Sequence, residues 1–119
     1  MRILDKNDIQ NNFDFDKAVE AIRMAYISAS TDNASIAPVG HLSFPDNNGD
    51  CHCKSGHIKG DDFFVIKIAT GFYDNPSLGR PSSNGVMVVF SATSGEPVAL
   101  LKDEGWLTDM RTGIGGAIT

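Results

Sequence analysis

The chain has 119 residues, of which 41% are hydrophobic and 21% are charged, and its formal net charge is −5. This length and composition predict a single globular domain over residues 1–119. The acidic balance gives no reason to expect binding to nucleic acid or to an anionic membrane, and no apolar run approaches the ~20 residues of a transmembrane helix.

The N-terminal segment and the two cysteines predict a cytoplasmic protein. Residues 1–12 are too polar for a signal peptide. Cys51 and Cys53 are one residue apart, so a disulfide between them would be strained, and we expect free thiols in a reducing compartment. Their spacing, even with His57 nearby, matches none of the usual zinc patterns, so we expect no metal site.

The first third of the chain predicts a short strand and one long helix. Arg2–Leu4 is the strand, and Asp14 offers an N-cap to a helix that runs to about Ala29. Apolar side chains recur along this helix at a spacing that places them on one face. We expect that face to pack on a sheet.

The middle of the chain predicts strands joined mainly by short turns. They cover residues 35–44 (interrupted by Pro38 and Gly40), 51–58, 63–70, 85–92 and 97–101. The pattern predicts an α+β fold, with a mainly antiparallel sheet of about five or six strands that the N-terminal helix covers and with a second helix at the C-terminus.

Lys67 is the only charged residue of the strand over 63–70, which is apolar on both faces and is therefore expected to be buried or nearly so. Two interpretations stay open. Lys67 is a strand-edge lysine that blocks aggregation, or it is a functional amine whose pKa is lowered by burial. The turn-rich loop from Gly71 to Ser82 follows directly, and it is either a binding loop or a surface excursion.

The last segment predicts a helix with Thr108 as its N-cap, beginning at Asp109. Arg111 would then lie in the first turn, where the guanidinium and the free backbone N–H groups could bind an anion together. The alternative is that Arg111 pairs with Asp103, Glu104 or Asp109.

Three glycines, Gly113, Gly115 and Gly116, fall inside this predicted helix, where each costs ~1 kcal/mol relative to alanine. Their use would be a close approach of a ligand or another domain to the backbone. Their spacing is not the dinucleotide-binding fingerprint.

Several motifs together resemble the ornithine cyclodeaminase/mu-crystallin family over essentially the whole chain, most sharply from Lys67 to Thr112. They are Lys67 itself, Gly71-Phe72-Tyr73-Asp74-Asn75-Pro76, Gly79-Arg80-Pro81-Ser82, Thr93-Ser94-Gly95-Glu96-Pro97 with Ala99-Leu100-Leu101, and Leu107-Thr108-Asp109-Met110-Arg111-Thr112.

The resemblance implies a substrate-binding and dimer-forming domain. In the family, a Rossmann domain for NAD(H) or NADP(H) follows it, and the shared chemistry is hydride transfer at the α-carbon of an amino acid or its imine. We expect a homodimer and a small amino or imino acid as ligand. We expect no Rossmann domain in these residues, so the chain alone should neither bind NAD or NADP nor catalyse hydride transfer.

The resemblance also implies roles for individual residues. Lys67 matches the catalytic lysine, which contacts the substrate and takes part in proton transfer. Arg111 matches the arginine that binds the substrate carboxylate and touches the cofactor. Ser82 matches a hydroxyl near the cofactor, and Thr112, next to Arg111 in the same motif, is assigned to cofactor binding with it.

One departure concerns the substrate. The family often has a second substrate arginine in a Pro-x-Arg context, but here Gly40 follows Pro38-Val39. The substrate therefore need not be ornithine, and Lys54, on the neighbouring strand, is our candidate for a replacement cation. The competing hypothesis for the whole chain is a small dimeric, non-enzymatic module that binds an amino acid or associates with an intact homologue.

Overall fold

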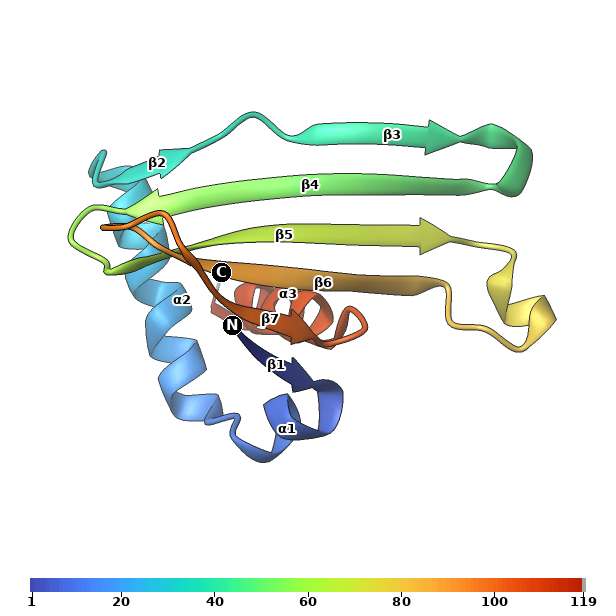
Figure 1. The fold of residues 1–119 in the computed structure, drawn as a ribbon, viewed down its shortest axis with the longest axis horizontal. Coiled ribbons are helices and arrows are strands. Elements are labelled where there is room, and N and C mark those ends of the chain that lie inside the picture. The colour runs from blue at the N-terminus through green and yellow to red at the C-terminus, as the bar shows by residue number, and fades with distance from the viewer. Residues whose placement is uncertain (119) are drawn as a thin grey trace.

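The computed structural model describes residues 1–118, with side chains as far as residue 115. Seven strands form one mixed sheet in the order β1-β7-β6-β5-β4-β2, and β3 also pairs with β4 (Figure 1). The strands are β1 (Arg2–Asp5), β2 (Ala34–Ile36), β3 (Gly40–Phe44), β4 (Gly49–Ile58), β5 (Phe63–Phe72), β6 (Ser83–Ser91) and β7 (Pro97–Lys102).

The longer helices lie together on one side of this sheet. They are α2 (Phe15–Ser30) and α3 (Trp106–Ile118), which contact each other and lie behind the strands in Figure 1. A short helix, α1 (Lys6–Asn11), follows β1, and two 3-10 turns, η1 (Pro45–Asn47) and η2 (Asn75–Leu78), lie at the end of the sheet away from α2. The N-terminal helix therefore shares the cover of the sheet with α3.

The start of α2 confirms the capping prediction. The Asp14 carboxylate accepts a hydrogen bond from the backbone N–H of Lys17 at 3.1 Å. Helix α1 was not predicted, although a capping box marks its start. The Asp5 carboxylate accepts from the Asp8 N–H at 2.8 Å, and the Asp8 carboxylate accepts from the Asp5 N–H at 3.1 Å.

The sheet is larger and less regular than the expected one of about five or six strands. The first strand, β1, pairs parallel with β7, so the sheet is mixed, while every other pairing is antiparallel. The expected strand over 35–44 is two strands, β2 and β3, that both pair with β4. Pro38 lies in the gap between them, since proline has no N–H to give to the ladder.

The strand that carries Lys67 lies inside the sheet, between β4 and β6. The interpretation of Lys67 as a strand-edge residue is therefore wrong. The expectation that both faces of this strand are buried is only partly met, because Ile68, on the face that α2 and α3 leave open, is 37% exposed.

Helix α3 begins at Trp106, so the prediction of Thr108 as its N-cap is wrong. Asp103, only 1% exposed, organises this start. Its backbone oxygen accepts from the Trp106 N–H at 3.0 Å, and its carboxylate accepts from the Leu107 N–H at 2.8 Å. Arg111 consequently lies in the second turn, where the free N–H groups of the helix start do not add to its charge.

One of the three helical glycines permits a close helix contact. A Cβ atom on Gly115 would lie 2.7 Å from the Tyr26 hydroxyl of α2, whereas one on Gly113 would meet nothing within 4 Å. The close approach at Gly115 is thus made by a helix of the same chain. Gly116 lies outside the residues whose contacts are described.

Two further observations concern the cysteines and the helices. Cys51 and Cys53 are free thiols. Across residues 1–118, the helices are all too short or too polar to span a bilayer.

Replacing Asp103 by alanine should lower the free energy of unfolding by about 1–2 kcal/mol, because the first turn of α3 loses its carboxylate acceptor. Urea denaturation followed by circular dichroism measures this change. Asp109→Ala removes the same charge from the exposed first turn of that helix and serves as the control, with a loss of about 0.5 kcal/mol from the helix dipole. Equal losses for the two variants would contradict the role given to Asp103.

Candidate functional site

Two lysines stand side by side on the helix-covered face of the sheet. Lys67 of β5 lies directly opposite Lys54 of β4 and, on its other side, opposite Met87 of β6. Opposed residues of antiparallel strands point to the same face, with Cβ atoms about 5 Å apart. Because side chains alternate along a strand, Cys51 and Cys53 of β4 lie on the face opposite to Lys54.

Helix α3 adds a third cation to the two lysines. The pKa of the half-buried Lys67 amine is lowered from 10.5, first by burial and then by the positive charges of Arg111 and Lys54, while the carboxylate of Asp103 acts in the opposite direction. Arg111 and Lys54 are therefore each close enough to Lys67 to act on its charge. The structure brings these three predicted residues together on one side of the sheet.

The three cations keep their charge available for a ligand. No carboxylate within 4.0 Å of Lys54, Lys67 or Arg111 is found among the residues with described side chains. The alternative in which Arg111 pairs with Asp103, Glu104 or Asp109 is thus not realised in this part of the chain. A guanidinium without an acidic partner, next to an amine of lowered pKa, suits the binding of a small carboxylate with a proton donor or acceptor beside it.

Sequence reasoning named Asp103 only as a possible partner of Arg111 and missed its contacts with the start of α3 and its effect on Lys67. It is the acid that acts on the Lys67 amine and also the one that starts α3. The available signal was an aspartate four residues before Leu107, at a position from which a carboxylate can bind a helix N–H.

The predicted cofactor residues are more scattered. Ser82 precedes β6, and its backbone oxygen accepts from the Phe72 N–H at 2.7 Å. Met87 is opposite Lys67, so the five residues back to Ser82 put it about 17 Å along the sheet from that amine. Thr112, beside Arg111 on α3, donates its hydroxyl to the Thr108 backbone oxygen at 2.9 Å. Only an elongated ligand could contact Ser82 and the Lys67 region at the same time.

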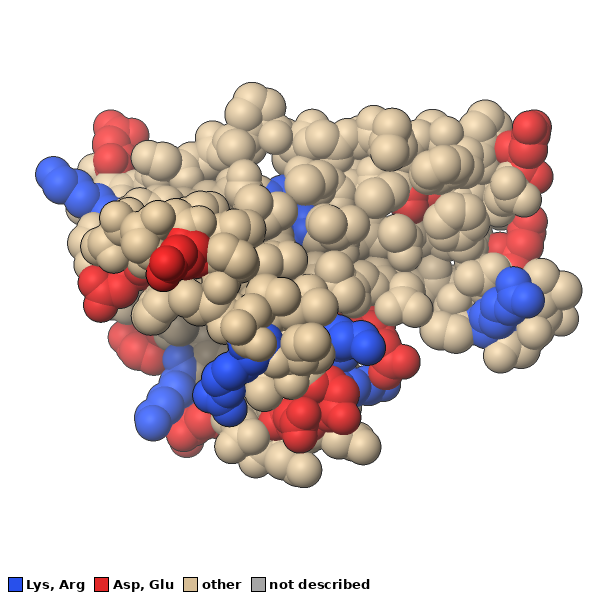
Figure 2. Space-filling model, viewed as in Figure 1, with Lys and Arg blue, Asp and Glu red and all other residues tan. Residues whose placement is uncertain are grey.

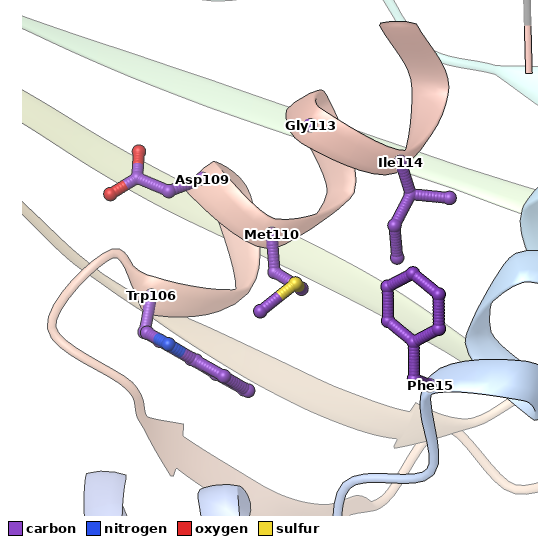
Figure 3. A pocket seen from close by; sticks show the side chains of 6 residues that line it. All are labelled: Phe15, Trp106, Asp109, Met110, Gly113 and Ile114. Atoms are coloured by element: carbon purple, nitrogen blue, oxygen red, sulfur yellow. The ribbon is translucent and has the colours of Figure 1, made fainter. Parts of the chain in front are cut away.

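A pocket of about 350 Å³ between α2 and α3 is separate from the cation cluster (Figure 3). It is mainly apolar, and its lining consists of Phe15, Trp106, Asp109, Met110, Gly113 and Ile114. Neither Lys67 nor Arg111 belongs to it, so this pocket is not the meeting place of the two groups.

A second polar group continues the lysine face toward the far end of β4. The rings of His41 and His52 stack at 4.6 Å, and His52 lies 3.9 Å from the Asp50 carboxylate. Tyr73 donates its hydroxyl to that carboxylate at 3.2 Å, and this hydrogen bond raises the pKa of Tyr73 from 10.0. The face therefore carries ionisable groups well beyond Lys67.

The comparisons with known proteins agree with this fold. Residues 1–119 match the ornithine cyclodeaminase/mu-crystallin family. The chain is 39% identical over 120 residues to an uncharacterized cyclodeaminase of Sinorhizobium fredii, covering 99% of this chain and 36% of that protein.

Two solved structures are similar in fold. One is an archaeal alanine dehydrogenase dimer with bound NAD, with a TM-score of 0.90 and 24% identity over 99% of this chain and 35% of that one. The other is the Thermococcus litoralis Delta(1)-pyrroline-2-carboxylate reductase in complex with NADH and L-proline, with a TM-score of 0.91 and 20% identity over 99% of this chain and 36% of that one. The chain therefore belongs to the ornithine cyclodeaminase/mu-crystallin family, and it spans about a third of the length of the relatives that it matches.

Proposed function

We propose that this chain is the substrate-binding part of an NAD- or NADP-dependent enzyme that acts on an amino acid or a cyclic imino acid. Arg111 holds the substrate carboxylate, and the Lys67 amine serves as acid and base at the reacting nitrogen or carbon. The observation that carries the proposal is the pairing of a half-buried amine of lowered pKa with a guanidinium that has no acidic partner among the described side chains.

The two groups divide the chemistry between them. A planar guanidinium can donate two parallel hydrogen bonds to a carboxylate, which fixes the orientation of the α-carbon. An amine whose pKa lies below 10.5 releases and regains a proton more readily near neutral pH than an ordinary lysine does. The Asp103 carboxylate opposes this shift and so limits how far the pKa of Lys67 falls.

The residues assigned to the cofactor suit an extended anionic ligand. Arg111 and Ser82 carry hydrogen-bond donors, and the Thr112 hydroxyl can accept a hydrogen bond while it donates to the Thr108 oxygen. The distance between Ser82 and Lys67 matches an elongated molecule better than a compact one. The nicotinamide group would supply hydride acceptance or donation when bound. Since these three residues are few for a dinucleotide, we propose that residues 1–119 alone are not catalytically competent.

The alternative is a non-enzymatic module that binds an amino acid. The same cation cluster supports it, because holding a carboxylate requires no cofactor. Oxidation of NADH with an imino acid by this chain alone would contradict both the alternative and the proposed lack of competence.

We also propose that the chain forms a homodimer through the open face of the sheet. This face presents apolar side chains from neighbouring strands, among them Ile66 and Ile68 of β5 and Val86 and Val88 of β6. Figure 2 views the molecule from this side, and most Lys, Arg, Asp and Glu lie near the ends of the strands and around the helices below the sheet, with only small charged patches showing between the strands. A wide, mainly apolar face with few charges is typical of a protein interface.

Replacing Arg111 by methionine should weaken binding of pyruvate or L-alanine at least tenfold, since a charge-assisted pair of hydrogen bonds is lost. Isothermal titration calorimetry measures this effect. Arg80→Met makes the same chemical change on the distant η2 loop and should leave the affinity unaltered. L-Alaninol, which lacks the carboxylate, should not bind the unaltered chain, and equal affinity for alanine and alaninol would refute the assignment.

The pKa of Lys67, measured by NMR titration of its side chain, should lie below 10.5 and should rise toward that value in Arg111→Met and, to a smaller extent, in Lys54→Met. A pKa lowered by folding means that the protonated amine opposes folding at neutral pH and that this cost decreases as the pH rises from the folded pKa to the unfolded value of 10.5. Lys67→Met should therefore increase stability at pH 7 more than at pH 10. An unchanged pKa in both charge variants would contradict the proximity of the three cations.

Ile68→Lys should convert the dimer to a monomer, because a charge in the middle of the open face would be buried on association. Sedimentation velocity at micromolar concentration measures the change. Met24→Lys, on the exposed surface of α2, is the matched control and should remain dimeric. A monomeric unaltered chain would contradict the proposal, and circular dichroism of each variant verifies that the fold is intact.

A further inference from the structure

We infer that the ligand of this site carries a second carboxylate and that Lys54 binds it. The inference rests on the proposed function, since it takes Arg111 as the receptor of the α-carboxylate. It concerns the class of substrate, which becomes an acidic amino acid or the corresponding 2-oxo or imino acid.

The positive charges around Lys67 are more than one ligand carboxylate would neutralise. Three cations face the same region, and Asp103 is the single carboxylate among the groups that shift the pKa of Lys67. The Asp103 oxygen Oδ2 already accepts from the Leu107 N–H at 2.8 Å. A monocarboxylate bound by Arg111 would leave Lys54 without an anion, whereas a dicarboxylate would satisfy both cations.

The position of Lys54 suits the side chain of such a ligand. Lys54 of β4 lies directly opposite Lys67 of β5 and points to the same face, and α3, which carries Arg111, lies on that side of the sheet (Figure 1). Arg111 and Lys54 both act electrostatically on the Lys67 amine. A ligand with its α-carboxylate on Arg111 and its α-carbon near Lys67 would extend its side chain toward Lys54.

The groups beyond Lys54 do not compete for its charge. His52 is the next residue of β4 on this face, and it stacks on His41. Asp50, the nearest acid along the strand, is engaged by the Tyr73 hydroxyl at 3.2 Å and lies 3.9 Å from His52. Lys54 itself is exposed and has no ion pair among the described side chains.

The test compares ligands that differ only in the second charge. L-Glutamate against L-glutamine, and L-aspartate against L-asparagine, are titrated calorimetrically into the 119-residue chain at low ionic strength. We expect at least one acidic member to bind about tenfold tighter than its amide, in line with a hydrogen bond between charged groups. Lys54→Met should reduce the affinity for the acid to that for the amide and leave the amide unaffected, and Lys54→Arg should preserve the preference.

Lys59→Met is the matched control, because Lys59 is exposed in the turn between β4 and β5, about 17 Å along the strand from Lys54. It should keep the full preference for the acid. Equal binding of acid and amide by the unaltered chain, with both affinities still dependent on Arg111, would overturn the second-carboxylate inference alone. Failure of all four ligands to bind would also overturn that inference, and failure of pyruvate and L-alanine in addition would overturn the proposed function.

Discussion

The buried carboxylate of Asp103 links the folding of this chain to its candidate site. It accepts the Leu107 N–H and so determines where α3 begins, and the same carboxylate acts on the Lys67 amine. Because the helix start is determined by a side chain that is only 1% exposed, the position of Arg111, further along α3, is tied to the end of β7. Asp103 therefore helps to determine how the Arg111 guanidinium on α3 is positioned relative to the Lys67 amine on β5.

The cation cluster is an electrostatic constraint that the chain does not relieve within its described side chains. Burial and two neighbouring positive charges lower the pKa of Lys67, and one carboxylate acts against them. Like charges at this spacing oppose folding, so their persistence requires a compensating gain. An anionic ligand at the proposed site would supply that gain, since it would replace mutual repulsion with attraction at each cation. The arrangement that lowers stability would then increase affinity.

Much of the fold follows from local signals in the sequence. The predicted and observed elements differ where contacts between distant segments determine the structure. Asp14 and the apolar stripe after it were sufficient for α2, and the strand pattern over residues 51–58 was sufficient for most of β4. The parallel pairing of β1 with β7 joins opposite ends of the chain, and no local pattern carries that information. The early start of α3 depends on a carboxylate three residues before the helix, whereas Thr108 offered an equally acceptable local cap.

For the site as well, the sequence indicates residue types but not how far apart the residues lie in the fold. Residue chemistry and resemblance gave Lys67, Arg111 and Lys54 as candidates, and the structure places Lys54 and Arg111 close enough to Lys67 to act on its charge. Ser82 was selected on the same grounds, yet it lies near the end of β5 and β6, about 17 Å along the sheet from Lys67. Motif spacing gives the order of residues along the chain but not their separation, so the role of Ser82 depends on a ligand long enough to reach it.

The two faces of the sheet have opposite character because strand side chains alternate. On β5, Lys67 points toward α3 while its neighbours Ile66 and Ile68 point to the open face. An apolar face covered by a second copy would make the sheet rigid from one side and leave the other side free to hold a ligand. Dimer contacts on the open face would then help to hold the cations of the opposite face in place. This is a reason for the apolar face and the cation cluster to occur on the same strands.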